Sequence, residues 1–263
     1  MVITIVGTGY VGLVTGAVFA DFGHTVYCID IDDNKIKSLD NGKIPFYEPG
    51  LEELVRRNSQ QKRLIFTTSY QEPVHKSKIV FICVGTPPGK GGEADTSFLF
   101  AAIEEIAKNL IKELLIVIKS TVPMGLEEEL EKTINKHTRI PFELASCPEF
   151  LKEGSAIEDT KSPDRIVIGT QNKKAVQTLL ELYKPFNGQR IVTGLRSAQM
   201  IKYASNTYLA TKISFANAIA LLCDKLGANV DDVLSGVGTD ARIGRKFLYP
   251  GVITKILLTS PTF

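Results

Sequence analysis

The sequence of 263 residues lacks tryptophan and has only three histidines and three methionines. It also lacks an uninterrupted apolar run of the roughly 18 to 20 residues that a membrane-spanning helix needs. The chain starts directly with the strand-like MVITIVG, without the basic region and cleavage site of a signal peptide. These absences argue against export and membrane insertion, and we expect a cytoplasmic protein.

Cysteine is scarce as well, with four residues at irregular spacing. Cys28, Cys83, Cys147 and Cys223 form no Cys-x-x-Cys pair, and in a reducing compartment we expect no disulfides. Three of them lie in apolar segments, where a cysteine is usually a small buried hydrophobe. Only Cys147, which precedes Pro-Glu, has a setting that suggests another role, and no metal site is predicted.

No charge of one sign dominates, since 31 basic and 29 acidic residues leave a formal net charge of +2. Such a balance provides no field that would recruit nucleic acid or an anionic membrane. With 44% hydrophobic residues, the chain is long enough for one large domain or two lobes with a sizeable core. A small or nucleotide-like partner fits this composition better.

The sequence does contain a regular alternation of short β-branched runs and longer segments of helical period. Strands are expected at 3–7, 25–30, 63–68, 79–85, 114–120, 142–147, 165–169 and 190–194. Helices are expected at 11–22, 33–40, 50–57, 97–110, 125–136 and 172–183. This alternation predicts an α/β fold with a Rossmann-like, doubly wound parallel sheet.

After Thr193 the pattern changes to a long helix at about 197–226 and a shorter one at about 230–234. The change predicts a lobe boundary near residue 195. We therefore expect a dinucleotide-binding domain over 1–195 and a helical, dimerising domain over 196–263.

A glycine-rich turn, Gly7, Gly9 and Gly12, lies between an expected strand and an expected helix, and Asp30 ends the next strand. In that context G-x-G-x-x-G predicts a dinucleotide site: the glycines allow a tight turn, approach of the pyrophosphate and close helix packing. Asp30 would accept hydrogen bonds from the ribose hydroxyls and repel a 2′-phosphate, which favours NAD over NADP. A glycine turn without a ligand is the alternative.

Three further polar turns follow expected strands, at Gly85-Thr86, at Ser120-Thr121 and at Cys147-Pro148-Glu149. The carboxyl ends of parallel strands are where ligands bind in open α/β sheets. Each turn taken alone is also explained by a helix cap followed by proline.

Two pairs of polar residues have the spacing of one helical turn. If EFLKEG is such a turn, Glu149 and Glu153 share a face near the cofactor. Lys202 and Asn206 lie four residues apart in the long helix. If they face a cleft, they could hold an alkoxide and a sugar hydroxyl. A solvated charge cluster and a surface stripe are the respective alternatives.

Several segments together resemble the UDP-glucose 6-dehydrogenases of the wider UDP-glucose/GDP-mannose dehydrogenase family. The resemblance runs from residue 1 to about Gly251, in the same order and spacing. It is carried by IVGTGYVGLVTGAVFADFGHTV, IPFYEPGLEELV, VGTPP, KSTVPMG, CPEFLKEGSAIED, PDRIVIG, the 202–206 helix and DARIGRKFL. It implies an NAD-dependent four-electron oxidation of UDP-glucose at C6 to UDP-glucuronate, through a thiohemiacetal and a thioester.

The resemblance also assigns residues. It implies catalytic roles for Thr121, Glu149, Lys202 and Asn206, with Glu149 handling the hydrolytic water and the last two stabilising an oxyanion. It implies NAD contacts at Gly7, Gly9, Tyr10, Val11, Gly12, Asp30, Lys35, Thr86, Thr121 and Glu153. It implies substrate contacts at Glu149, Phe150, Leu151, Lys152, Lys202, Asn206, Phe247, Leu248, Tyr249, Pro250 and Gly251.

The end of the sequence departs from the family pattern. In the family a glycine-rich stretch with the catalytic cysteine follows the FLxxG turn, and then a lobe that binds the uridine diphosphate. Here Gly251 is followed by VITKILLTSPTF. We expect a chain truncated by a frameshift or premature stop, with Cys147 no obvious substitute nucleophile, that binds NAD but forms no UDP-glucuronate at a useful rate.

Two functions therefore stay open: a dehydrogenase, or a non-catalytic fragment that binds NAD and forms a homodimer through its long helix. Turnover of NAD with UDP-glucose separates them. A Rossmann dehydrogenase of small hydroxy acids is disfavoured because FLKEG and the Lys202/Asn206 pair have counterparts in the sugar-nucleotide enzymes.

Overall fold

The computed structural model describes residues 1–252, and these divide into two compact units. The first unit comprises Met1–Met200, and the second begins at Ile201. Most of the terminal segment on which the truncation hypothesis depends, 253–263, lies outside the described residues.

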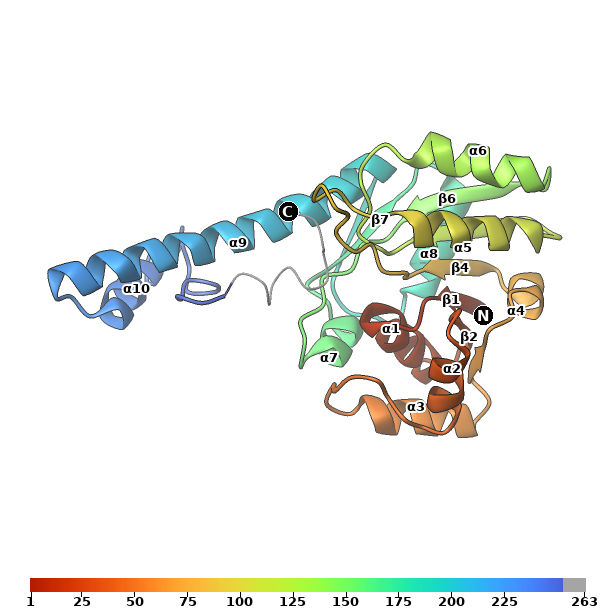
Figure 1. Ribbon diagram of the computed structural model, residues 1–263, viewed down its shortest axis with the longest axis horizontal. Coiled ribbons are helices and arrows are strands. Elements are labelled where there is room, and N and C mark those ends of the chain that lie inside the picture. Colours follow the sequence, from red (N-terminus) through yellow and green to blue (C-terminus); the bar gives the residue numbers. More distant parts are fainter. Residues whose placement is uncertain (253–263) are drawn as a thin grey trace. The chain divides into compact units, whose positions relative to one another are not determined.

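An eight-stranded sheet organises the first unit (Figure 1) and confirms the predicted fold class. Its strands follow the order β3-β2-β1-β4-β5-β6-β7-β8, and every neighbouring pair is parallel except β6 and β7. The strands are β1 Val2–Val6, β2 Thr25–Ile29, β3 Leu64–Thr67, β4 Ile79–Ile82, β5 Leu114–Ile118, β6 Phe142–Ser146, β7 Arg165–Gly169 and β8 Gln189–Thr193. The strand order reverses between β1 and β4, which creates the crevice where such sheets bind ligands.

Both faces of the sheet are buried, because alternate side chains of each strand enter different hydrophobic clusters. In β4, Ile79 and Phe81 join one cluster, while Val80 and Ile82 join the other. The first cluster is covered by α1 Tyr10–Asp21, α2 Asp33–Asp40, α3 Leu51–Gln60, α7 Ala156–Lys161 and α8 Lys173–Leu182. The second is covered by α4 Gln71–Lys76, α5 Ser97–Lys108 and α6 Glu127–His137. The helices thus form a layer on each side of the sheet.

Helices α4 and α7 were not expected from the sequence. Each has only six residues, and α4 contains Pro73. Helices this short have little intrinsic stability, so tertiary packing of Val74 and Ala156 in the two clusters determines them.

The second unit contains most of α9 Leu195–Leu226, together with α10 Val230–Gly238. Its small core consists of Ala216, Leu234 and Leu248, with Ile219 and two valines packed against them. Asn229 caps α10 by accepting a hydrogen bond from the Asp231 amide at 2.9 Å. None of the helices within residues 1–252 has the length and apolar character required to cross a membrane.

Candidate functional site

The glycine-rich turn connects β1 to α1 at the switch point of the sheet. Gly7 has a φ of +95°, and a Cβ on it would lie 2.7 Å from the Cys83 carbonyl oxygen. A Cβ on Gly12 would lie 1.9 Å from the carbonyl oxygen of Gly7. Glycine is therefore required at both positions by the backbone packing of the turn itself.

Gly9 differs, since a Cβ built on it would meet no atom within 4 Å. The residue is the N-cap of α1, whose first turn contains no acidic side chain. Open space above a backbone amide, next to the positive end of a helix, suits an anionic group. The turn thus fits the pyrophosphate of a dinucleotide, with Gly9 left free for the approach of the ligand.

Asp30 follows β2 at the same edge of the sheet and is 8% exposed. Its Oδ2 accepts hydrogen bonds from the Thr8 amide at 2.9 Å and the Thr8 hydroxyl at 2.7 Å. Lys35 Nζ donates to the same oxygen at 2.7 Å, and the Asp32 amide donates to Oδ1 at 3.1 Å. Burial alone would raise the pKa of Asp30, but the bonds from Lys35, Thr8 and Asp32 outweigh it and lower the pKa. Asp30 is therefore an ionised, fixed carboxylate beside the glycine turn.

The turns after β4 and β5 are joined to each other. The buried Thr86 hydroxyl donates to the carbonyl oxygen of Thr121 at 2.8 Å. Ser120 Oγ donates to the Val84 carbonyl at 2.6 Å. Thr86 and Thr121 thus lie together at the carboxyl edge of neighbouring strands.

The EFLKEG segment after β6 is not a helical turn, so the condition for Glu149 and Glu153 to share a helix face is not met. Residues 147–152 have no regular structure, and a turn at 153–154 leads into α7. The Glu149 side chain accepts a hydrogen bond from the Leu151 amide at 2.6 Å, which fixes an extended start of the segment. Gly154, with a φ of +86°, then allows the chain to turn.

Glu149 is 3% exposed and lies in the interior, whereas Glu153 is exposed. Cys147 is buried as well, and burial raises the pKa of its thiol to about 12. A thiol with this pKa carries almost no thiolate at neutral pH. Cys147 therefore has the properties of a structural cysteine, like the buried Cys28, Cys83 and Cys223.

The remaining residues of EFLKEG are held by neighbours that the sequence did not single out. Lys152 Nζ lies 3.1 Å from Asp159 Oδ1, and the Lys152 amide donates to Asp159 Oδ2 at 2.9 Å. The guanidinium of Arg165 lies 3.9 Å from the centroid of the Phe150 ring, in a cation–π arrangement. Leu151 packs against the larger core.

Glu48 is the other residue that sequence reasoning missed as a separate feature, although it lies within the IPFYEPGL motif. Its carboxylate is 5% exposed and accepts hydrogen bonds from Tyr10, Gly154 and Ala156. An acidic residue before Pro-Gly has no local signature of burial, so only the structure identifies this contact.

Of the other predicted site residues, Val11 lies in the first turn of α1, and the rest belong to the second unit. Lys202 and Asn206 lie one turn apart in α9 and are 2% and 6% exposed, so the alternative of a surface stripe is wrong. In the FLYPG turn, Leu248 is buried and Tyr249 is half exposed, and Phe247 has a φ of +59°. The Gly251 amide donates to Asn217 Oδ1 at 2.8 Å and ties the turn to α9.

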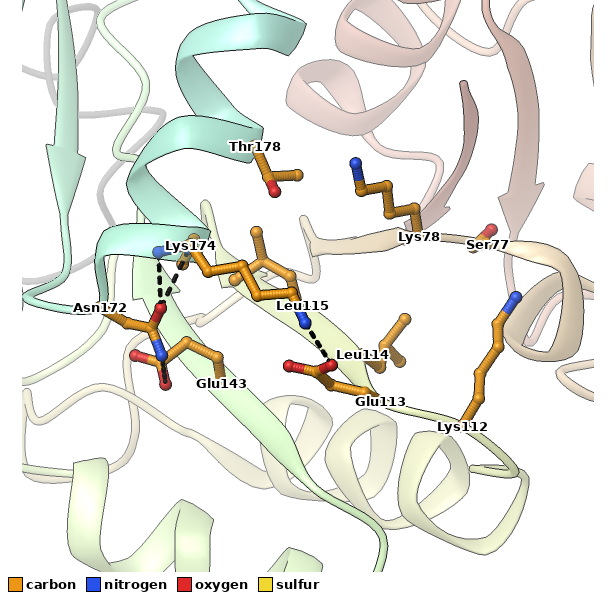
Figure 2. A pocket seen from close by; sticks show the side chains of 11 residues that line it. Ser77, Lys78, Lys112, Glu113, Leu114, Leu115, Glu143, Asn172, Lys174 and Thr178 are labelled. Atoms are coloured by element: carbon orange, nitrogen blue, oxygen red, sulfur yellow. Dashed lines mark hydrogen bonds and ion pairs between the residues drawn. The ribbon is translucent and has the colours of Figure 1, made fainter.

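A cavity of about 270 Å³ lies at the opposite, amino-terminal edge of β4, β5 and β6 (Figure 2). Figure 2 shows two contacts between its polar side chains, one between Lys174 and Glu113 and one between Asn172 and Glu143. In the second, Asn172 Nδ2 donates to Glu143 Oε2 at 3.0 Å. Because both carboxylates of its lining already bind neighbouring side chains and the cavity lies away from the glycine turn, we do not place the cofactor there.

The chain matches two domain models of one protein family. Residues 1–187 match the UDP-glucose/GDP-mannose dehydrogenase family, NAD binding domain, and residues 196–254 match the central domain of that family. The UDP-glucose 6-dehydrogenase TuaD of Bacillus subtilis is 50% identical over 252 residues, which are 95% of this chain and 55% of TuaD. The UDP-glucose 6-dehydrogenase of Rhizobium meliloti is 49% identical over 95% of this chain and 59% of its own length.

Solved structures agree with the fold. A UDP-glucose dehydrogenase from Pyrobaculum islandicum superposes with a TM-score of 0.92 at 39% identity, over 98% of this chain and 62% of that one. A ternary complex of GDP-mannose dehydrogenase from Pseudomonas aeruginosa gives a TM-score of 0.88 at 33% identity, over 95% and 60%. The chain thus spans little more than half the length of the curated relatives it matches.

Proposed function

Because the chain belongs to the UDP-glucose/GDP-mannose dehydrogenase family, we propose that it serves the NAD-dependent oxidation of UDP-glucose at C6 to UDP-glucuronate. The cofactor is NAD, since residues 1–187 are the NAD binding domain of this family. UDP-glucose is proposed as the substrate because the curated relatives at 49% to 50% identity are UDP-glucose 6-dehydrogenases.

The observation that carries this proposal is the open space at Gly9, next to the fixed carboxylate of Asp30, at the switch point of the sheet. Bound NAD would supply the hydride acceptor. Gly7, Gly9 and Gly12 would hold its pyrophosphate, Asp30 its ribose, and the turns with Thr86 and Thr121 its distal half.

On the substrate side, we assign Glu149 to positioning the hydrolytic water, as its buried carboxylate at the carboxyl end of β6 suits this task. Lys202 and Asn206 are assigned to the oxyanion that develops at C6, because an ammonium and an amide can donate hydrogen bonds to it. Phe150, Leu151, Lys152 and the FLYPG turn are assigned to substrate binding.

The test is formation of NADH by the purified 263-residue chain, followed by absorbance in the presence of NAD and UDP-glucose. GDP-mannose is the matched control substrate. NADH formed only with UDP-glucose supports the dehydrogenase, whereas NAD binding without turnover supports the non-catalytic, NAD-binding alternative. Turnover with GDP-mannose alone would refute the substrate assignment, and failure to bind NAD would refute both functions.

We also propose that the chain forms a homodimer through α9. Tyr208, Phe215 and Leu222 recur every seven residues along this helix and are 62%, 48% and 53% exposed. Seven residues are nearly two helical turns, so these side chains form one exposed apolar stripe. Burial against a second copy removes such a stripe from water. For the compartment we propose the cytoplasm, in keeping with four free cysteines.

A further inference from the structure

Glu48 lies two residues before the N-cap of α3, and its buried carboxylate accepts three hydrogen bonds. Its Oε2 accepts from the Tyr10 hydroxyl at 2.7 Å and from the Gly154 amide at 2.8 Å. Its Oε1 accepts from the Ala156 amide at 2.8 Å. The side chain is thus anchored by two separate segments, which are 38 and 106 residues away from it in sequence.

Each of these segments belongs to the candidate site. Tyr10 is the first residue of α1 and directly follows Gly9, the glycine that leaves space for the ligand. Gly154 and Ala156 end the loop that carries Glu149 and Glu153. The Tyr10 hydroxyl oxygen also lies 3.1 Å from the Lys152 carbonyl oxygen, so the tyrosine and the carboxylate both contact the same loop. Burial, followed by the Glu48 carboxylate, raises the pKa of Tyr10, which keeps the hydroxyl a donor.

We infer that Glu48 is a positioning residue that fixes the loop 149–156 to the first turn of α1. Hydrogen bonds to a buried carboxylate are charge-assisted and therefore among the stronger ones. Through them the spacing between the glycine turn and the loop is set before any ligand binds. The inference rests on the proposed function, since it concerns the same dinucleotide site.

The strand order indicates which part of the dinucleotide depends on Glu48. Asp30 follows β2 and the glycine turn follows β1, whereas the loop 149–156 follows β6, on the other side of the switch point. With the adenosine ribose at Asp30, the nicotinamide half extends toward β4, β5 and β6. Misplacement of the loop should therefore weaken NADH, which has both halves, more than ADP, which lacks the nicotinamide half.

The test is the substitution Glu48→Gln, which keeps the shape of the side chain and replaces one acceptor oxygen with a donor. Whichever way the amide is oriented, the Gly154 or the Ala156 amide then faces an N–H group, so one buried donor loses its partner. We expect the dissociation constant of NADH to rise about tenfold, and that of ADP to change by less than about twofold.

Glu143→Gln is the matched control. Glu143 also accepts two hydrogen bonds, from Thr170 and Asn172 at 3.0 Å, but it lies at the amino-terminal edge of the sheet. The Glu143→Gln substitution should lower the melting temperature of the chain. It should not change the ratio of the affinity for NADH to the affinity for ADP. Two results would overturn the positioning role. One is a Glu48→Gln chain whose affinities for NADH and ADP fall by the same factor, and the other is a Glu48→Gln chain whose affinity ratio equals that of Glu143→Gln.

Tyr10→Phe is the second variant, and it serves if Glu48→Gln does not fold. It removes one of the three donors and keeps the ring, so the dissociation constant of NADH should rise about threefold. In the Glu48→Gln background the same change should have a smaller effect than in the wild type, because the Tyr10 hydroxyl and both amides bind the same side chain. Independent, multiplicative effects, or unchanged NADH binding in Tyr10→Phe, would contradict the inference. A wild-type chain that binds no NADH would instead overturn the proposed function together with it.

Discussion

The Lys35 ammonium lies 2.7 Å from Oδ2 of Asp30, so the carboxylate at the end of β2 has its own counter-ion. Asp30 is nearly buried, whereas the Lys35 side chain is 29% exposed and can reach solvent at the same place. The pair places a negative and a positive charge where the adenosine ribose would bind. We therefore expect discrimination between NAD and NADP to depend on the balance of these two residues.

Replacement of Asp30 should change this balance toward NADP. In Asp30→Asn the negative charge that repels a 2′-phosphate is removed, and Lys35 is released to bind that phosphate. We expect the ratio of NADPH to NADH affinity to rise at least about tenfold, measured by calorimetric titration. Lys35→Met should shift the ratio in the opposite direction. A ratio that does not respond to either change would argue against ribose recognition at Asp30.

Asp30 should also contribute to the pH dependence of stability. Its pKa is lowered in the folded chain, so its contribution is fully present above the unfolded pKa of about 3.9 and is lost as pH falls through the folded pKa. The free energy of unfolding of the wild type should therefore exceed that of Asp30→Asn at pH 6. The difference should shrink as pH decreases below about 4 in urea denaturation. A difference that stays constant over this range would contradict the assigned hydrogen bonds.

Substitutions at two glycines of the turn should have different effects, one mainly on stability and the other mainly on NADH binding. Gly12→Ala would place a Cβ 1.9 Å from the Gly7 carbonyl oxygen, and we expect it to destabilise the chain by about 2 to 4 kcal/mol. Gly9→Ala meets no atom of the chain, so its cost should stay within about 1 kcal/mol. In contrast, Gly9→Ala should weaken NADH binding at least about tenfold, because the new methyl group occupies the place of the pyrophosphate. Thermal unfolding and NADH titration of both variants test this, and normal NADH binding by Gly9→Ala would disprove the placement of the ligand.

The apolar stripe of α9 should determine the oligomeric state. We expect a dimer by light scattering at about tens of micromolar, a range in which interfaces of standard size associate. Phe215→Ser and Leu222→Ser should shift the chain toward a monomer, since each removes an exposed apolar side chain from the stripe. Asp224→Ser, at an exposed polar position of the same helix, should leave the dimer intact. A wild-type monomer under these conditions would refute the proposed interface.

Much of the fold could be predicted from the sequence because strands buried on both faces and helices of regular period have local patterns. β1 to β8 and the long helix α9 follow these patterns. Helices α4 and α7 do not, since six residues are too few for a helical period to be recognised. Their formation depends on packing against the sheet.

Only part of the candidate site could be predicted from the sequence. The glycine turn and Asp30 can be recognised in the sequence because their spacing is typical of one local β-α-β unit. The roles of Glu48 and Asp159 are not, because a buried acid and a surface acid look alike in sequence. Glu48 meets its partner Gly154 across 106 residues, a contact that only the tertiary structure creates. EFLKEG does not form a helical turn for a local reason, the hydrogen bond from the Leu151 amide to Glu149.

The central claim is that the glycine turn and Asp30 form an NAD site, and it is tested most directly by calorimetric titration of the purified 263-residue chain with NADH and with NADPH. We predict saturable binding of one NADH per chain, with an affinity at least about tenfold higher than that for NADPH, since the Asp30 carboxylate opposes the 2′-phosphate. Absence of saturable NADH binding, or binding of NADPH that is equal or tighter, would contradict the account.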